Sequence, residues 1–170
     1  MSEHGWREAC GDVVAQSITS LFDAYGVMVT RIAEPDEPSN PIAATIGFTS
    51  PQASGTLTLT MSAAVVASAG ASGANLGAVT DWAGELANQA LGRIKNRLLS
   101  YGIELRVANP VVVVGTELRV HPAGQAAFSY WFSTPTGRLN VHLSAKVDSS
   151  FVWVRADDTP AMAEGEFMML

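Results

Sequence analysis

Cysteine, histidine and charge are all scarce in this 170-residue sequence. The single cysteine, Cys10, excludes a disulfide framework and a zinc site built from cysteines. The three histidines, His4, His121 and His142, lie far apart with no metal-ligand spacing among them, so we expect no metal site. Charged residues make up 15% and the formal net charge is -6, which argues against nucleic acid and anionic membrane as partners because both need a basic surface.

The longest stretch without charge, residues 38–80, does not read as a membrane span. Prolines and glycines interrupt it, and serine and threonine are frequent in it. Residues 1–4 lack the basic region and apolar stretch of a secretory signal, so the expected compartment is the cytoplasm. Hydrophobic residues make up 48% of the sequence, enough to exclude disorder for most of the chain.

Periodicity and turn residues predict an ordered α/β (α+β) domain. Helices are expected over 7–24, 62–69 and 80–101. Strands are expected over 27–32, 42–49, 56–61, 103–108, 111–114, 116–120, 126–133, 138–147 and 151–155. We assign residues 1–156 to a single domain and residues 157–170 to an acidic, loosely ordered tail.

Two segments of the chain are similar in sequence, which suggests an internal repeat. The segment Tyr25–Pro35 resembles Tyr101–Pro110, each follows a predicted helix, and each is followed by a strand that begins at Asn-Pro, at Asn40-Pro41 and at Asn109-Pro110. We predict two helix-strand-strand-strand units around a pseudo-twofold axis, with two long helices packed on an antiparallel or mixed sheet. Coincidence between short strand-rich segments is the alternative.

The helix predicted over 80–101 has two distinct faces. Its apolar face carries Ala83, Ala87, Ala90, Leu91, Ile94 and Leu98. Its polar side carries Asp81, Glu85, Asn88, Gly92 and Lys95. The first three of these follow steps of four and three residues, which puts them on one ridge. The simpler interpretation is a solvated face whose acids come early and bases late, as suits the helix dipole.

These residues carry a resemblance to a known family. The motif consists of Asp81, Glu85, Asn88, Gly92 and Lys95, followed by Asn109-Pro110 and a valine run that ends at Gly115. It resembles the CheC/CheX/FliY family of chemotaxis phosphatases, and within it the CheX branch. The motif covers residues 81–115, and the repeat layout extends the similarity more weakly over most of the chain.

The resemblance implies an activity and a role for each site residue. Members of the family remove the phosphoryl group from the aspartyl-phosphate of a response-regulator receiver domain such as CheY, which supplies its own Mg²⁺; no cofactor is expected in this chain. Asn88 would position the attacking water, and Glu85 would dock on the receiver's lysine. Asp81 is expected either at the rim of the partner contact or as a helix-capping acid, and Gly92 would leave the ridge open to the partner.

The repeat also predicts the number of sites. With Tyr25 laid on Tyr101, Glu85 falls on Ala9 and Asn88 falls on Asp12, so one site per chain is expected and a homodimer is possible. The rival hypothesis is a non-catalytic adaptor or switch-type module that only binds a response regulator. Exposure of Glu85 and Asn88 would favour turnover, and burial of the pair would favour the adaptor.

Overall fold

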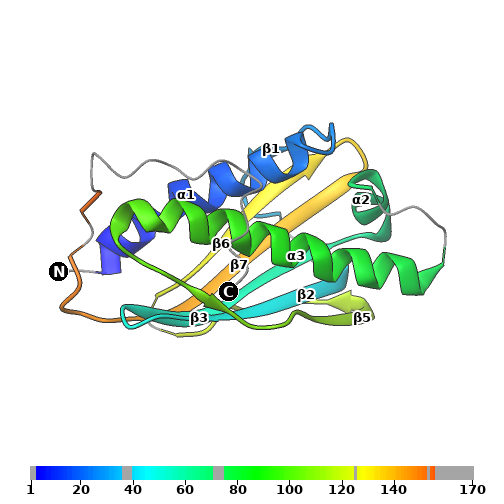
Figure 1. Ribbon diagram of the computed structural model, residues 1–170. Helices are drawn as coiled ribbons and strands as arrows, with labels where there is room; N and C mark the ends of the chain where they lie inside the picture. The colour runs from blue at the N-terminus through cyan, green and yellow to red at the C-terminus, as the bar shows by residue number, and fades with distance from the viewer. Residues whose placement is uncertain (1–2, 36–39, 71–74, 125, 153, 156–170) are drawn as a thin grey trace.

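A single antiparallel sheet organises the molecule, and two long helices lie side by side on one of its faces (Figure 1). The computed structural model describes residues 3–35, 40–70, 75–124, 126–152 and 154–155. The helices of this part are α1 (Glu3–Asp23), α2 (Ala63–Ser68), α3 (Leu76–Leu98) and the short 3-10 helix η1 (Leu99–Tyr101). Its strands are β1 (Thr30–Ile32), β2 (Asn40–Thr49), β3 (Ala53–Met61), β4 (Arg106–Val107), β5 (Val111–Leu118), β6 (Ala126–Thr134) and β7 (Gly137–Val147).

The sheet order confirms the predicted pseudo-twofold repeat. The strands lie in the order β1-β6-β7-β3-β2-β4, with every pairing antiparallel. Exchanging β1 with β4, β2 with β6 and β3 with β7 reproduces the same order, read from the other end. The first strand of each unit therefore pairs with a strand of the other unit: β1 pairs with β6, and β4 pairs with β2. Thr30 of β1 and Arg106 of β4 stand at equivalent places after Tyr25 and Tyr101.

Strand β5 breaks this symmetry, and its position shows that the predicted equivalence of the two Asn-Pro pairs was wrong. It pairs with β2 between Asn40 and Thr45, beyond the short stretch at Phe48 and Thr49 where β4 pairs. The symmetry relates β2 to β6, so the two Asn-Pro pairs do not begin equivalent strands. The second unit thus has one strand more than the three of the predicted repeat unit, and the extra strand is the one that follows Pro110.

Several strand predictions were wrong in detail. Only Thr30–Ile32 of the predicted strand 27–32 and only Arg106–Val107 of the predicted strand 103–108 are strands. The two predicted strands over 111–120 form one, β5. Of 151–155, the described residues are not in a strand. Strand β7 ends at Val147, opposite Ala53, the first residue of β3, and the Asp148 amide still donates to the Gln52 carbonyl at 2.8 Å before the chain continues without strand pairing. The predicted tail over 157–170 lies outside the described residues, and the domain boundary at 156 stays a prediction.

The two long helices bury their apolar faces against the sheet. From α1 the side chains of Val14, Ile18, Leu21 and Phe22 are fully buried. From α3 the whole predicted apolar face, from Ala83 to Leu98, is buried as expected. Cys10 is also buried, as predicted for a small core residue, and burial raises the pKa of its thiol. No helix in the described ranges is long and apolar enough to cross a membrane.

The other face of the sheet buries a group of polar side chains around His142. Thr58, Asn140 and His142 are each less than a tenth exposed. Nδ1 of His142 is hydrogen-bonded to the Ser129 hydroxyl at 2.8 Å, and its ring meets that of Trp131 edge-on. Burial, together with a smaller effect of the charge of His121, lowers the pKa of His142 from 6.5 to about 4. The imidazole is therefore neutral in the folded protein at neutral pH.

The first prediction concerns the acid sensitivity that follows from His142. In the unfolded chain this histidine takes up a proton below about pH 6.5, whereas the folded protein resists protonation until about pH 4. The unfolded state therefore binds more protons in this window, and stability falls as the pH falls through it. We expect a loss of about 2 kcal/mol between pH 7 and pH 5. Urea unfolding at several pH values measures it, and His142→Asn should flatten the dependence in this window. An unchanged pH dependence in that variant would contradict the assignment.

Candidate active site

Helix α3 begins earlier than the sequence suggested, and this changes the place of Asp81. The side chain of Asn75 caps the helix, its Oδ1 accepting a hydrogen bond from the Ala78 amide at 2.8 Å. Asp81 lies in the second turn and is exposed. Its interpretation as a helix-capping acid was therefore wrong, because Asn75 fills that position. The other position expected for Asp81, at the rim of a partner contact, stays a prediction.

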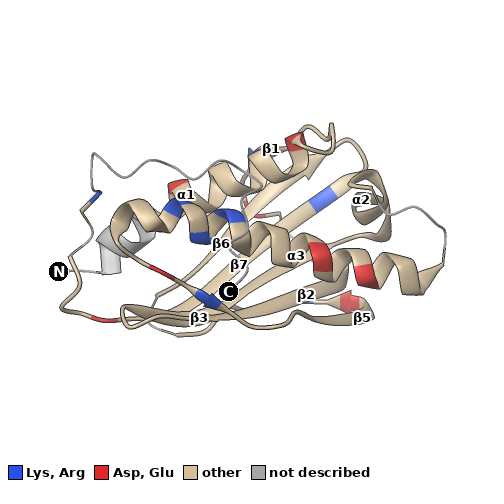
Figure 2. Ribbon diagram, viewed as in Figure 1, with Lys and Arg blue, Asp and Glu red and all other residues tan. Residues whose placement is uncertain are grey.

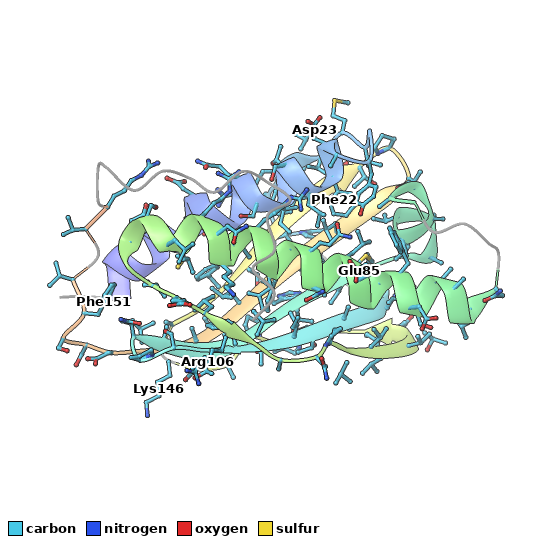
Figure 3. All side chains as sticks on the ribbon, in the orientation of Figure 1. Phe22, Asp23, Glu85, Arg106, Lys146 and Phe151 are labelled. Atoms are coloured by element: carbon cyan, nitrogen blue, oxygen red, sulfur yellow. The ribbon has the colours of Figure 1, made fainter. Side chains whose placement is uncertain are left out.

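The predicted site residues share one accessible ridge of α3. Asp81 and Asn88 are exposed, and Glu85 and Gly92 are partly exposed. A side-chain carbon built at Gly92 would meet no atom within 4 Å, so the helix surface there is open to an approaching molecule. Glu85 lies in the middle part of α3 (Figure 3). An acid and an amide one turn apart are thus both within reach of another molecule.

A hydrogen-bonded chain holds the Glu85 side chain from the side of α1. The Gln89 amide nitrogen donates to Glu85 Oε1 at 2.9 Å, and the Tyr25 hydroxyl donates to Gln89 Oε1 at 2.8 Å. Neither Gln89 nor Tyr25 was among the site residues predicted from the sequence. The spacing of four residues between Glu85 and Gln89 was a usable signal. Nothing in the sequence pointed to Tyr25, which is 64 residues away from Gln89.

The proline of the motif lies against the same helix. A side-chain carbon at Gly84 would stand 3.4 Å from Val112 Cγ2 and 3.6 Å from Pro110 Cγ. Gly84 is buried by this contact. The extra strand β5 therefore approaches α3 at the residue that precedes Glu85, and this brings the two separated parts of the motif together.

The charges of α3 are divided along its length. Its acids, Asp81 and Glu85, belong to the first half, and its bases, Arg93, Lys95 and Arg97, to the second half (Figure 2). The first half, which carries Glu85, thus offers a carboxylate to a positively charged group. Among the described residues, no three metal-ligating side chains are grouped closely enough to hold an ion.

Several solved structures that resemble this one are chemotaxis proteins. CheX from Vibrio vulnificus matches with a TM-score of 0.69 at 19% identity, over 78% of this chain and 96% of that one. CheX from Desulfovibrio desulfuricans matches with a TM-score of 0.65 at 16% identity, over 82% and 98%. A complex of CheX with CheY, BeF3 and Mg²⁺ from Borrelia burgdorferi matches with a TM-score of 0.57 at 10% identity, over 82% and 96%. The fold is therefore that of the CheX-type chemotaxis proteins.

The sequence itself gives the family. The family model described as chemotaxis phosphatase CheX matches residues 42–133, which is more than half of the chain. The chain therefore belongs to the CheX family of chemotaxis phosphatases, as the motif on α3 implied. No curated protein matches the sequence significantly.

The exposure of Asn88 leads to a prediction about stability. Asn88→Ala should leave the free energy of unfolding unchanged or raise it by up to about 0.5 kcal/mol, because alanine is the better helix former at an exposed position. Asn75→Ala is the matched control, since it removes a helix cap and should cost about 1 kcal/mol. Urea unfolding compares the two. A clear destabilisation by Asn88→Ala would mean that this asparagine supports the fold.

Proposed function

We propose that this protein accelerates hydrolysis of the aspartyl-phosphate on a CheY-like receiver domain, with Asn88 positioning the attacking water and Glu85 docking on the receiver's lysine. The observation that carries the proposal is the accessible acid–amide pair on α3 in a member of the CheX family. The site has one copy per chain, because Ala9 and Asp12 stand at the equivalent places in α1.

The chemistry of phosphoryl transfer suits an asparagine. The reaction needs positioning and charge neutralisation more than covalent help from the protein. A carboxamide has both a donor and an acceptor, so Asn88 can hold a water through its oxygen and face the phosphoryl oxygens with its nitrogen. A carboxylate at the same place would be repelled by the phosphoryl group. The exposed position of Asn88 allows it to enter a pocket on another protein.

Glu85 suits a docking role. A carboxylate that meets a lysine ammonium makes a charge-assisted contact, and this contact would set the angle at which Asn88 enters. The spacing of three residues keeps both side chains on the same side of the helix. Asp81 and Gly92 lie on the same ridge, where we assign them to the partner contact.

The proposal also covers the metal and the compartment. Mg²⁺ belongs to the receiver rather than to this chain, and the CheX complex from Borrelia burgdorferi contains CheY and Mg²⁺ together. The receiver's location in the cytoplasm would place this protein there as well. A homodimer stays a prediction.

The rival function is an adaptor that binds a response regulator without turnover. Accessibility of the pair was the discriminating observation, and Asn88 is exposed while Glu85 is partly exposed. This favours turnover over the adaptor.

The third prediction tests catalysis directly. Phosphorylated receiver domains from the same organism should lose phosphate faster in the presence of the protein. Asn88→Ala should lower the rate gain by about 100-fold or more, in the range seen when one well-placed polar group is removed from an active site. Binding of the receiver should change little, since docking is assigned to Glu85. Phosphate release and a separate binding measurement give the two quantities.

Asn96→Ala is the matched control, because it removes the same side chain from the same helix two turns further on. It should keep the full rate gain. If no receiver is accelerated, or if Asn88→Ala is as active as the unchanged protein, the proposed mechanism is wrong. Receiver binding without any acceleration would establish the adaptor instead.

A further inference from the structure

The chain of hydrogen bonds from Tyr25 to Glu85 has only one possible polarity. The Glu85 carboxylate can only accept, so the Gln89 amide nitrogen must face it, at 2.9 Å. This leaves the Gln89 oxygen for Tyr25, whose hydroxyl donates to it at 2.8 Å. Each group thus fixes the orientation of the next, and the chain ends on the carboxylate that is assigned to docking.

Tyr25 is itself held firmly from several sides. It follows α1 in a turn that ends the helix at Gly26, which has a positive φ of 69° and whose N–H donates a hydrogen bond to the Asp23 carbonyl. Its ring meets the edge of Trp82 with 5.9 Å between centroids. The Trp82 indole in turn donates to the Ala69 carbonyl at the end of α2, at 2.7 Å. Tyr25 therefore has a defined position from which to orient Gln89.

Close packing around Gly70 reinforces this arrangement. A side-chain carbon at Gly70 would lie 3.4 Å from the Trp82 ring and 3.6 Å from the Tyr25 ring. The φ of Gly70 is +106°, a conformation that other residues rarely adopt. The backbone after α2 can thus approach both rings, and α1, α2 and α3 all contribute to the support of one side chain.

A glutamate on a helix surface usually samples several rotamers, and a partner that binds it must order it first. Ordering before binding removes that entropic cost. Asn88 has the opposite need, since it has to reach into a pocket on the partner, and it is exposed. The Glu85 side chain is therefore held by hydrogen bonds while the Asn88 side chain is exposed, although the two residues are only one turn apart.

We propose that Gln89 and Tyr25 are positioning residues that hold the Glu85 carboxylate ready for a cationic group of the partner. This inference rests on the proposed docking role of Glu85 and deepens it. Because the Glu85 carboxylate reaches the same contact once the receiver is bound, loss of Tyr25 or Gln89 should weaken affinity for the phosphorylated receiver and leave the hydrolysis step unchanged.

The test uses the full-length protein and a phosphorylated receiver that it dephosphorylates. Tyr25→Phe removes only the hydroxyl, and Gln89→Met keeps the length of the side chain while it removes both polar groups. Each should raise KM by about threefold to tenfold, the range expected when one side chain must be ordered on binding, and leave kcat within about twofold. In a Glu85→Gln background the effect of either substitution on KM should disappear, because the carboxylate they position is gone.

Tyr101→Phe is the matched control, because Tyr101 occupies the equivalent place in the second structural unit. It should leave KM unchanged. If KM is the same in Tyr25→Phe and Gln89→Met as in the unchanged protein, or if their effect persists undiminished in the Glu85→Gln background, the positioning role is wrong. A loss confined to kcat would overturn it as well.

A second measurement needs no substrate and separates this inference from the proposed function. Three-bond NMR couplings of the Glu85 side chain report its rotamer populations in the free protein. One dominant rotamer is expected in the unchanged protein and in Tyr101→Phe, and averaged couplings are expected in Tyr25→Phe and Gln89→Met. Averaged couplings in the unchanged protein would overturn the positioning role. If no receiver is dephosphorylated but the couplings behave as expected, the catalytic proposal fails while the ordering of Glu85 stands.

Discussion

The burial of one face of α3 against the sheet is the constraint on which the rest of the structure depends. Ala83, Ala87 and Ala90 bring this face close to the strands, and Leu91 and Ile94 fill the space beside them. Because a helix has a fixed rotation per residue, burying these positions turns Asn88 toward solvent and leaves Glu85 at the edge of the buried face. The orientation of Glu85 and Asn88 thus follows from the packing of the core.

The differences between the two units of the pseudo-twofold frame, and not the frame itself, leave the acid–amide pair on one helix. Both units supply a long helix to the same face of the sheet, and each exchanges its first strand with the other. The frame alone would permit two sites. The second unit differs in two ways, since its helix carries the acid and the amide, and β5 places Pro110 against Gly84. The first unit contributes instead from the end of its helix, where Tyr25 reaches Gln89.

In the proposed mechanism the two site residues need different properties, a fixed side chain for Glu85 and a freely accessible one for Asn88. A docking carboxylate binds more tightly when its rotamer is fixed in advance, and Glu85 has a hydrogen-bonded support that extends to α1. A side chain that must enter a partner's pocket gains from standing free of its own protein, and Asn88 is exposed. The acids of α3 lie in its first half, whereas its bases lie further along the helix (Figure 2).

The sequence by itself determined the family, the repeat, the two long helices and the ridge that carries Glu85 and Asn88, because all of these depend on spacing within short segments. Strand ends were harder to predict, because a strand's length depends on the neighbouring strand that it pairs with: β7 ends at Val147, opposite the first residue of β3. Only the tertiary structure decided that β5 is an extra strand and that Asn75, not Asp81, caps α3. It alone joined Tyr25 to Gln89, because a contact across 64 residues depends on how two helices pack and leaves no periodic trace in the chain.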